Sequence, residues 1–308
     1  MTHAADARLR PKADADHRQV SEYRGRAIVL ALVGLVVATT AFVGNLAAVG
    51  QTGTARGSTL AWTFGVTTTG FALVKTAIAV VLWGIILKLW LRADSIKVAL
   101  AKLVSNPGAD NTPEGVVDTP YGKVTVSQTK PADLPIHKMA KKMFRPMVAM
   151  GGMLVLIGLI VAFVEAASFP NVTASAWKQG LQFLGEGMLL SGISFLLGTI
   201  LWAIRTAGGE VQESLGVKVY TPKMPAAAKG FVALMMLGLM VEITQFIGYI
   251  AVAGSSDPSV AFTWLAPLRE LGLGLILAGI TLALVAIANV LGFQFWRVQN
   301  LIRGGERS

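Results

Sequence analysis

Six long apolar stretches alternate with polar connections along this chain. A helix needs about 20 predominantly apolar residues to cross the hydrocarbon core of a bilayer. Each stretch is long enough, and each contains scattered glycine and alanine; they occupy residues 27–49, 66–90, 147–168, 181–204, 231–254 and 271–294. Buried helices of a soluble protein are the alternative, but the connections are too polar and irregular to cover them. The pattern therefore predicts an all-α integral membrane protein with six transmembrane helices.

Two of these stretches align without a gap, which indicates an internal repeat. LGEGMLLSGISFLL at 184–197 matches LGLGLILAGITLAL at 271–284, at an offset of 87 residues. Looser matches join the third and fifth stretches, through AFVE (162–165) and QFIG (245–248), and the first and fifth, through TTAFVGNLAAVG (39–50) and ITQFIGYIAVAG (243–254). We expect three helical hairpins that are parallel repeats, because each hairpin would begin and end on the same side of the membrane.

The hairpins and their connections divide the chain into seven segments. We expect a flexible tail at 1–26, hairpins at 27–92, 147–205 and 231–296, connections at 93–146 and 206–230, and a second tail at 297–308. Residues 93–104 carry a helical apolar stripe. This stripe indicates either a continuation of the second span or a helix that lies on the membrane surface.

Positive charge is distributed unevenly between the two sides of the predicted bundle. The chain has 27 Lys and Arg, 17 Asp and Glu, and a net charge of +10. The side that would hold both tails and both long connections carries 22 of the basic residues, and the other carries only Arg56, Lys178 and Arg269. Because basic residues concentrate in cytoplasmic connections, we expect both termini to be cytoplasmic, in the inner membrane of a prokaryote. Topology thus accounts for the charge, and nucleic acid is not an expected partner.

Two segments of the connections have a pattern typical of β-strands. YGKVTVSQTKP at 121–131 and LGVKVYTPKMP at 215–225 each run from a glycine through alternating positions to Lys and Pro. We expect these segments to pair as a small cytoplasmic β element. The alternative is a chance similarity between two short Val-rich loops.

A group of basic residues directly precedes the third apolar stretch: Lys138, Lys141, Lys142 and Arg145. Such a group attracts anionic lipid headgroups by about 1 kcal/mol per basic residue. The general excess of cytoplasmic charge explains the same residues without any specific lipid.

Lys88 lies close enough to the end of its apolar stretch for its charged group to reach the membrane interface. Four other ionisable residues lie within the apolar stretches or at their ends: Lys75, Glu165, Glu186 and Glu242. A charged residue at the centre of a transmembrane helix costs ~2.5 to 3.5 kcal/mol on insertion scales, so each needs a partner or a purpose. One interpretation pairs Lys75 with Glu242 or Glu186 and so fixes how the hairpins pack. The other makes these residues an ion or proton site, whose polar lining would be Thr76, Ser194, Thr244, Gln245 and Thr281.

The remaining chemistry of the chain is sparse. It has no cysteine, and His3, His17 and His137 lie outside the apolar stretches, which excludes disulfides, thiolate metal sites and intramembrane bis-His haem. The motifs of common membrane hydrolases are absent from the sequence. We therefore expect no enzyme, metal or cofactor, and favour a non-catalytic subunit or scaffold of a membrane complex, with other subunits or further copies as partners. The alternative is a channel or secondary transporter for a small solute, ion or proton that uses Lys75, Glu186 and Glu242.

Overall fold

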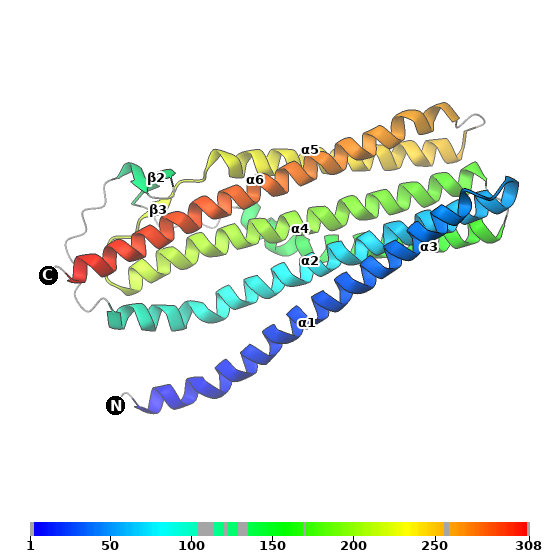
Figure 1. Cartoon of the computed structure of the whole chain (residues 1–308). Helices are drawn as coiled ribbons and strands as arrows, with labels where there is room; N and C mark the ends of the chain where they lie inside the picture. The colour runs from blue at the N-terminus through cyan, green and yellow to red at the C-terminus, as the bar shows by residue number, and fades with distance from the viewer. Residues whose placement is uncertain are drawn as a thin grey trace.

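The computed structural model consists of long helices and a small sheet (Figure 1). It describes residues 3–103, 114–119, 122–128, 135–168, 171–255 and 259–306. Within these residues the helices are α1 (His3–Ala48), α2 (Gly53–Leu103), α3 (Pro135–Ala167), α4 (Val172–Ser214), α5 (Ala226–Ala253) and α6 (Ser259–Glu306). Each has an apolar segment long enough to span a membrane, so the prediction of six such helices is confirmed.

Consecutive helices pair as three hairpins, α1 with α2, α3 with α4 and α5 with α6 (Figure 1). The central helix is α4, which contacts α2, α3, α5 and α6 and buries most of its apolar spanning segment. In contrast, α1 leaves large apolar side chains such as Leu32 and Val36 exposed within residues 28–46. We call the end of the bundle with both termini the terminal end, and the end with the three tight connections the turn end.

In each hairpin, one glycine of the first helix lies close to one glycine of the second. An added Cβ on the first glycine of a pair would lie 2.6 to 2.9 Å from the carbonyl oxygen of the second. The pairs are Gly34 with Gly70, Gly151 with Gly185, and Gly238 with Gly272. Without side chains at these positions, the helix backbones can approach closely.

The glycine contacts follow the numerical offset of the sequence alignment. Gly151 and Gly238 are 87 residues apart, and so are Gly185 and Gly272. The looser match of AFVE with QFIG has an offset of 83 residues, so it is one helical turn out of register with these contacts. The origin of the hairpins from one repeated unit stays a prediction.

Several helices extend beyond the apolar stretches that predict them. α2 begins at Gly53 instead of residue 66, α4 at Val172 instead of 181, and α6 at Ser259 instead of 271. Their first turns are rich in small and polar residues, which lower the local hydropathy, but packing satisfies these groups. The Thr63 hydroxyl, for example, donates to Asn45 Oδ1 at 2.6 Å. Lys178 and Arg269 therefore lie on helices and not in turns.

The terminal ends of α1 and α2 are also helical. α1 begins at His3 and so includes residues 3–26 of the segment that the sequence predicts as a tail. α2 continues to Leu103, which confirms that residues 93–103 prolong the second span instead of forming a separate surface helix. α3 begins at Pro135, in keeping with the preference of proline for the first position of a helix.

A three-stranded antiparallel sheet lies at the terminal end of the bundle, against α6 and α4 (Figure 1). Its strands, in sheet order, are β1 (Gly115–Thr119), β2 (Gly122–Ser127) and β3 (Thr221–Pro222). β2 and β3 come from the two segments predicted to pair, with Val126 opposite Pro222, so the predicted pairing is confirmed. The cytoplasmic location of the sheet stays a prediction. β1 was not predicted. Residues 104–113, 120–121 and 129–134 of the predicted connection lie outside the described residues.

Candidate functional site

Four charged side chains from different helices gather inside the bundle and form what we call the central cluster: Lys75, Glu186, Glu242 and Arg269. Glu186 of α4 is buried, and Lys75 Nζ of α2 lies 2.9 Å from its Oε1. Arg269 Nη2 of α6 lies 2.9 Å from its Oε2. One carboxylate of the central helix therefore joins the first hairpin to the third. Of the two predicted partners of Lys75, the structure selects Glu186.

Arg269 makes two further contacts that hold its guanidinium in place. Its Cζ lies 4.0 Å from the centroid of the Phe183 ring, and its Nη1 donates to Glu270 Oε1 at 3.1 Å. The side chain of Glu270 is 73% exposed, whereas that of Glu186 is only 2% exposed. Arg269 thus connects a buried acid to an exposed one, and its ring contact is the stacking that a planar guanidinium favours.

Glu242 of α5 is the fourth member of the cluster and differs from the others. Its side chain is fully buried, and neither carboxylate oxygen has a hydrogen-bond partner among the residues that the structure describes. It occupies a slot between Gly187 of α4 and Gly272 of α6. A Cβ added to these glycines would lie 2.7 Å from Glu242 Cγ and 2.6 Å from Glu242 Oε1, respectively. The two glycines therefore provide the space that the carboxyl group fills.

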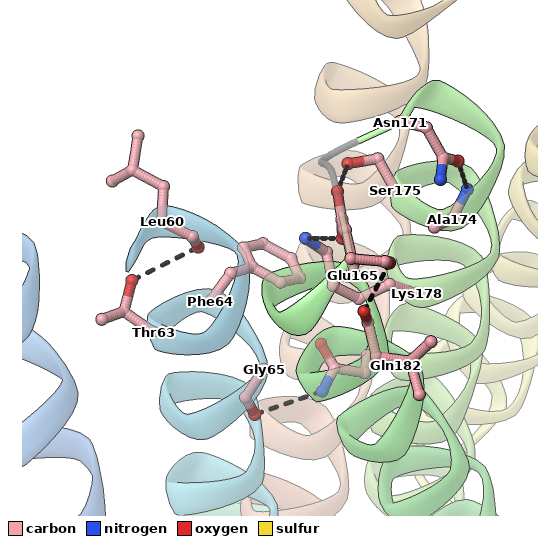
Figure 2. A network of polar contacts seen from close by, with 12 residues as sticks. Leu60, Thr63, Phe64, Gly65, Glu165, Asn171, Ala174, Ser175, Lys178 and Gln182 are labelled. Atoms are coloured by element: carbon pink, nitrogen blue, oxygen red, sulfur yellow. Dashed lines mark hydrogen bonds and ion pairs between the residues drawn. The ribbon is translucent and has the colours of Figure 1, made fainter. Parts of the chain in front are cut away.

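A second polar network lies nearer the turn end, between α2, α3 and α4 (Figure 2). Glu165 of α3 and Lys178 of α4 are both buried, and Lys178 Nζ lies 2.7 Å from Glu165 Oε2. The Ser175 hydroxyl donates to Glu165 Oε1 at 2.6 Å. One turn further along α4, Gln182 Nε2 donates to the carbonyl of Gly65 on α2 at 3.1 Å. This network, like the central cluster, connects helices of different hairpins.

The hydroxyl residues predicted as a possible polar lining make local hydrogen bonds within their own helices. Each hydroxyl donates to a backbone carbonyl four residues earlier, at 2.8 to 3.1 Å; the residues are Thr76, Ser194, Thr244 and Thr281. Thr244 and Thr281 are exposed on the outer surface, where this local hydrogen bond lets a hydroxyl face an apolar solvent. Gln245 is buried, and its Nε2 donates to the carbonyl of Leu265 at 2.9 Å. The role of these residues as a polar lining stays a prediction.

The basic group before the third span lies on the first turns of α3, at the terminal end. Lys138, Lys141, Lys142 and Arg145 are all exposed. The guanidinium of Arg145 also lies 5.0 Å from the centroid of the Trp83 ring on α2. Arg145 therefore has a packing role in addition to its charge.

A third set of polar contacts holds the connection 215–225 against the terminal ends of α4 and α6. Gln212 Oε1 accepts from the Tyr220 amide at 2.9 Å and from Arg297 Nε at 3.2 Å. Arg297 Nη2 donates to the carbonyl of Lys218 at 3.2 Å. Both Gln212 and Arg297 are buried. These contacts place β3 beside β2.

Two cations of the interior were missed because the hydropathy pattern assigns them to turns. Lys178 and Arg269 were counted as residues of the outer connections, yet each pairs with a buried acid. One signal was present in the sequence. When the aligned segments 184–197 and 271–284 are extended by two residues towards the N-terminus, Arg269 lies opposite Gln182. Gln182 belongs to the apolar stretch 181–204, so the alignment places Arg269 on a helix as well.

These features define the class of the protein. Long apolar helices with outward-facing apolar side chains, and charged residues turned towards one another inside the bundle, are those of a multi-pass helical membrane protein. The chain matches no protein-family model, no curated protein and no solved structure at a significant level.

Proposed function

We propose that this protein is a non-catalytic subunit or scaffold of a membrane assembly. The observation that supports this most is the double contact of Glu186 with Lys75 and Arg269, since it joins three hairpins through one buried carboxylate. Buried ion pairs of this kind contribute to the uniqueness of a packing more reliably than to its stability. A rigid arrangement of hairpins is what a scaffold needs in order to present a constant surface.

The outer surface is consistent with partners inside the membrane. Large apolar side chains are exposed on α1, α3 and α5, among them Val36, Ile160 and Met240. Lipid, other membrane subunits or further copies of the chain would cover them. Lys138, Lys141, Lys142 and Arg145 would then meet anionic headgroups, if the terminal end faces the cytoplasm of a prokaryotic cell as the distribution of charge favours.

The scaffold proposal is tested by a double-mutant cycle between Lys75→Met and Glu186→Gln. Removing one partner of a buried ion pair costs about 3 kcal/mol, so each single variant should lower the stability of the purified protein in a denaturant titration. The double variant should lose at least about 1 kcal/mol less than the sum of the two, because the two residues interact directly.

Glu270→Gln is the matched control, since this exposed acid also contacts Arg269. We expect its effect to be below about 0.5 kcal/mol. Strictly additive losses for Lys75→Met and Glu186→Gln would contradict a packing role for the pair. Mild-detergent purification followed by native mass spectrometry then identifies any protein that the scaffold holds.

A second candidate function is transport of a small solute, ion or proton through the central cluster. The observation that favours it is Glu242, a buried acid for which the packing provides no partner. Flux assays in proteoliposomes separate the two candidates. Flux that disappears in Glu242→Gln while the protein remains folded would replace the scaffold proposal, whereas absence of flux for a range of ions and solutes would support it.

A further inference from the structure

Glu242 has surroundings unlike those of the other two glutamates that are buried in the described part of the chain. Glu165 has Lys178 at 2.7 Å and the Ser175 hydroxyl at 2.6 Å. Glu186 has two cationic groups at 2.9 Å. Glu242 is at least as deeply buried, but its oxygens have no donor. A carboxylate in an apolar interior without a donor is strongly disfavoured, and such a group becomes neutral instead.

The charged groups around Glu242 balance one another without a charge on Glu242. The charged groups whose fields reach it are Arg269 and Glu270 of α6, Glu186 of α4 and Lys75 of α2. These two cations already contact the two acids, at 2.9 to 3.1 Å. The local set is balanced without a charge on Glu242. A negative Glu242 would therefore leave the interior with an uncompensated charge.

Packing alone does not require a carboxyl group at this position. In each hairpin, the residue four positions after the first glycine packs against the second glycine. That residue is Ala38 in the first hairpin, Val155 in the second and Glu242 in the third. Apolar side chains of different size serve in two of the three hairpins. The acid in the third hairpin therefore adds a chemical property and not merely volume.

The slot suits a proton better than a metal ion. Its walls are formed by Gly187 and Gly272, which have no side-chain ligands to offer. Among the described residues, no group of three or more acidic or histidine side chains could hold a metal ion. A bound cation needs several oxygen ligands, whereas a proton needs only one carboxylate oxygen.

We propose that Glu242 is a proton-binding site: its carboxylate takes up one proton, and the neutral carboxylic acid is the form that packs between Gly187 and Gly272. This inference goes beyond the scaffold role, and it holds whether or not the protein also transports a solute. Proton binding by Glu242 is reversible, and loss of the proton would put a negative charge beside Arg269.

The test is infrared spectroscopy of the full-length protein reconstituted in lipid. We expect the carbonyl stretching band of a protonated carboxylic acid at neutral pH, a shift of that band in deuterated buffer, and its loss on alkalinisation. The band should be absent in Glu242→Gln, which preserves the shape of the neutral acid. It should remain in Glu165→Gln, because that variant removes a buried carboxylate already paired with a cation.

Two results would overturn the proposal. One is a folded wild-type protein without this band, or with a band that survives in Glu242→Gln. The other is loss of the band at constant pH when sodium replaces potassium, which would indicate a metal-cation site. The infrared band reports proton binding by Glu242, and the flux assay reports transport. The two measurements are independent, so failure of the proton-binding proposal can be told apart from failure of either proposed function.

Discussion

At the scale of single residues, glycines decide which side chains can enter the interior. Gly187 and Gly272 border the slot of Glu242, so any side chain there would overlap its carboxyl group. Gly274 lies only two residues further along α6, but nothing approaches the position of its absent Cβ within 4 Å. Two glycines of one helix therefore have different physical roles, and this difference can be measured.

Gly272→Ala is expected to destabilise the protein by about 1 to 3 kcal/mol, the usual cost of overpacking a well-filled interior. The added Cβ would lie 2.6 Å from Glu242 Oε1, and Gly187 restricts movement of the carboxyl group on the other side. Gly274→Ala is the control and should be neutral or stabilising by up to about 1 kcal/mol, since alanine favours the helix. Thermal unfolding in detergent measures both. Equal effects of the two variants would contradict the slot.

At the scale of elements, α4 organises the molecule because it is a partner in all three sets of interior polar contacts. Glu186 belongs to the central cluster, Lys178 to the network of Figure 2, and Gln212 to the contacts that hold the connection 215–225. The helix is 43 residues long, or about 65 Å at 1.5 Å per residue, so it extends well beyond a 30 Å hydrocarbon core. It can therefore connect the bundle interior with the sheet at the terminal end.

Gln212→Ala is expected to loosen the connection 215–225. The variant removes the acceptor of the Tyr220 amide and of Arg297 Nε, and Gln212 Nε2 also donates to the Tyr220 carbonyl at 2.9 Å. Each lost hydrogen bond contributes about 0.5 to 1.5 kcal/mol. Hydrogen exchange at the Tyr220 amide should accelerate by at least about tenfold.

Lys218→Ala provides the control for this measurement. The Lys218 side chain is exposed, and Arg297 contacts only its backbone carbonyl, which alanine retains. We expect exchange at Tyr220 to change little in this variant. Unchanged exchange in Gln212→Ala would indicate that packing of Tyr220 with Val117, Val126 and Phe293 holds the segment by itself.

At the scale of the whole molecule, both termini and the sheet lie at one end of the bundle, and the three tight connections lie at the other (Figure 1). The terminal end carries most of the basic residues of the chain. The arrangement and the rule of positive cytoplasmic charge together predict which end faces the cytoplasm.

The absence of cysteine makes the orientation directly measurable by single-cysteine labelling. Thr52 is exposed at the turn end, and Lys123 is exposed on β2 at the terminal end, so each can be replaced by cysteine. A membrane-impermeant maleimide should label Thr52→Cys in intact spheroplasts and Lys123→Cys only after the membrane is permeabilised. The opposite pattern would invert the predicted orientation.

The sequence by itself determined the features that depend on local composition. Long runs of apolar residues predicted six helices. Two segments with alternating side chains, each bounded by a glycine and a proline, predicted the pairing of β2 with β3. Local composition also explains the errors. The polar first turns of α2, α4 and α6 lower hydropathy, so Lys178 and Arg269 were assigned to turns even though both are helical.

Only the tertiary structure decided which charged groups meet. Lys75, Glu186 and Arg269 come from three hairpins, and their pairing depends on the lateral order and relative height of α2, α4 and α6. Those quantities follow from the packing of α2 and α6 against α4, between residues that are far apart in the chain. Hydropathy is a sum over neighbours in sequence and contains no such information. For the same reason, only the packed bundle distinguishes the paired Glu186 from the unpartnered Glu242.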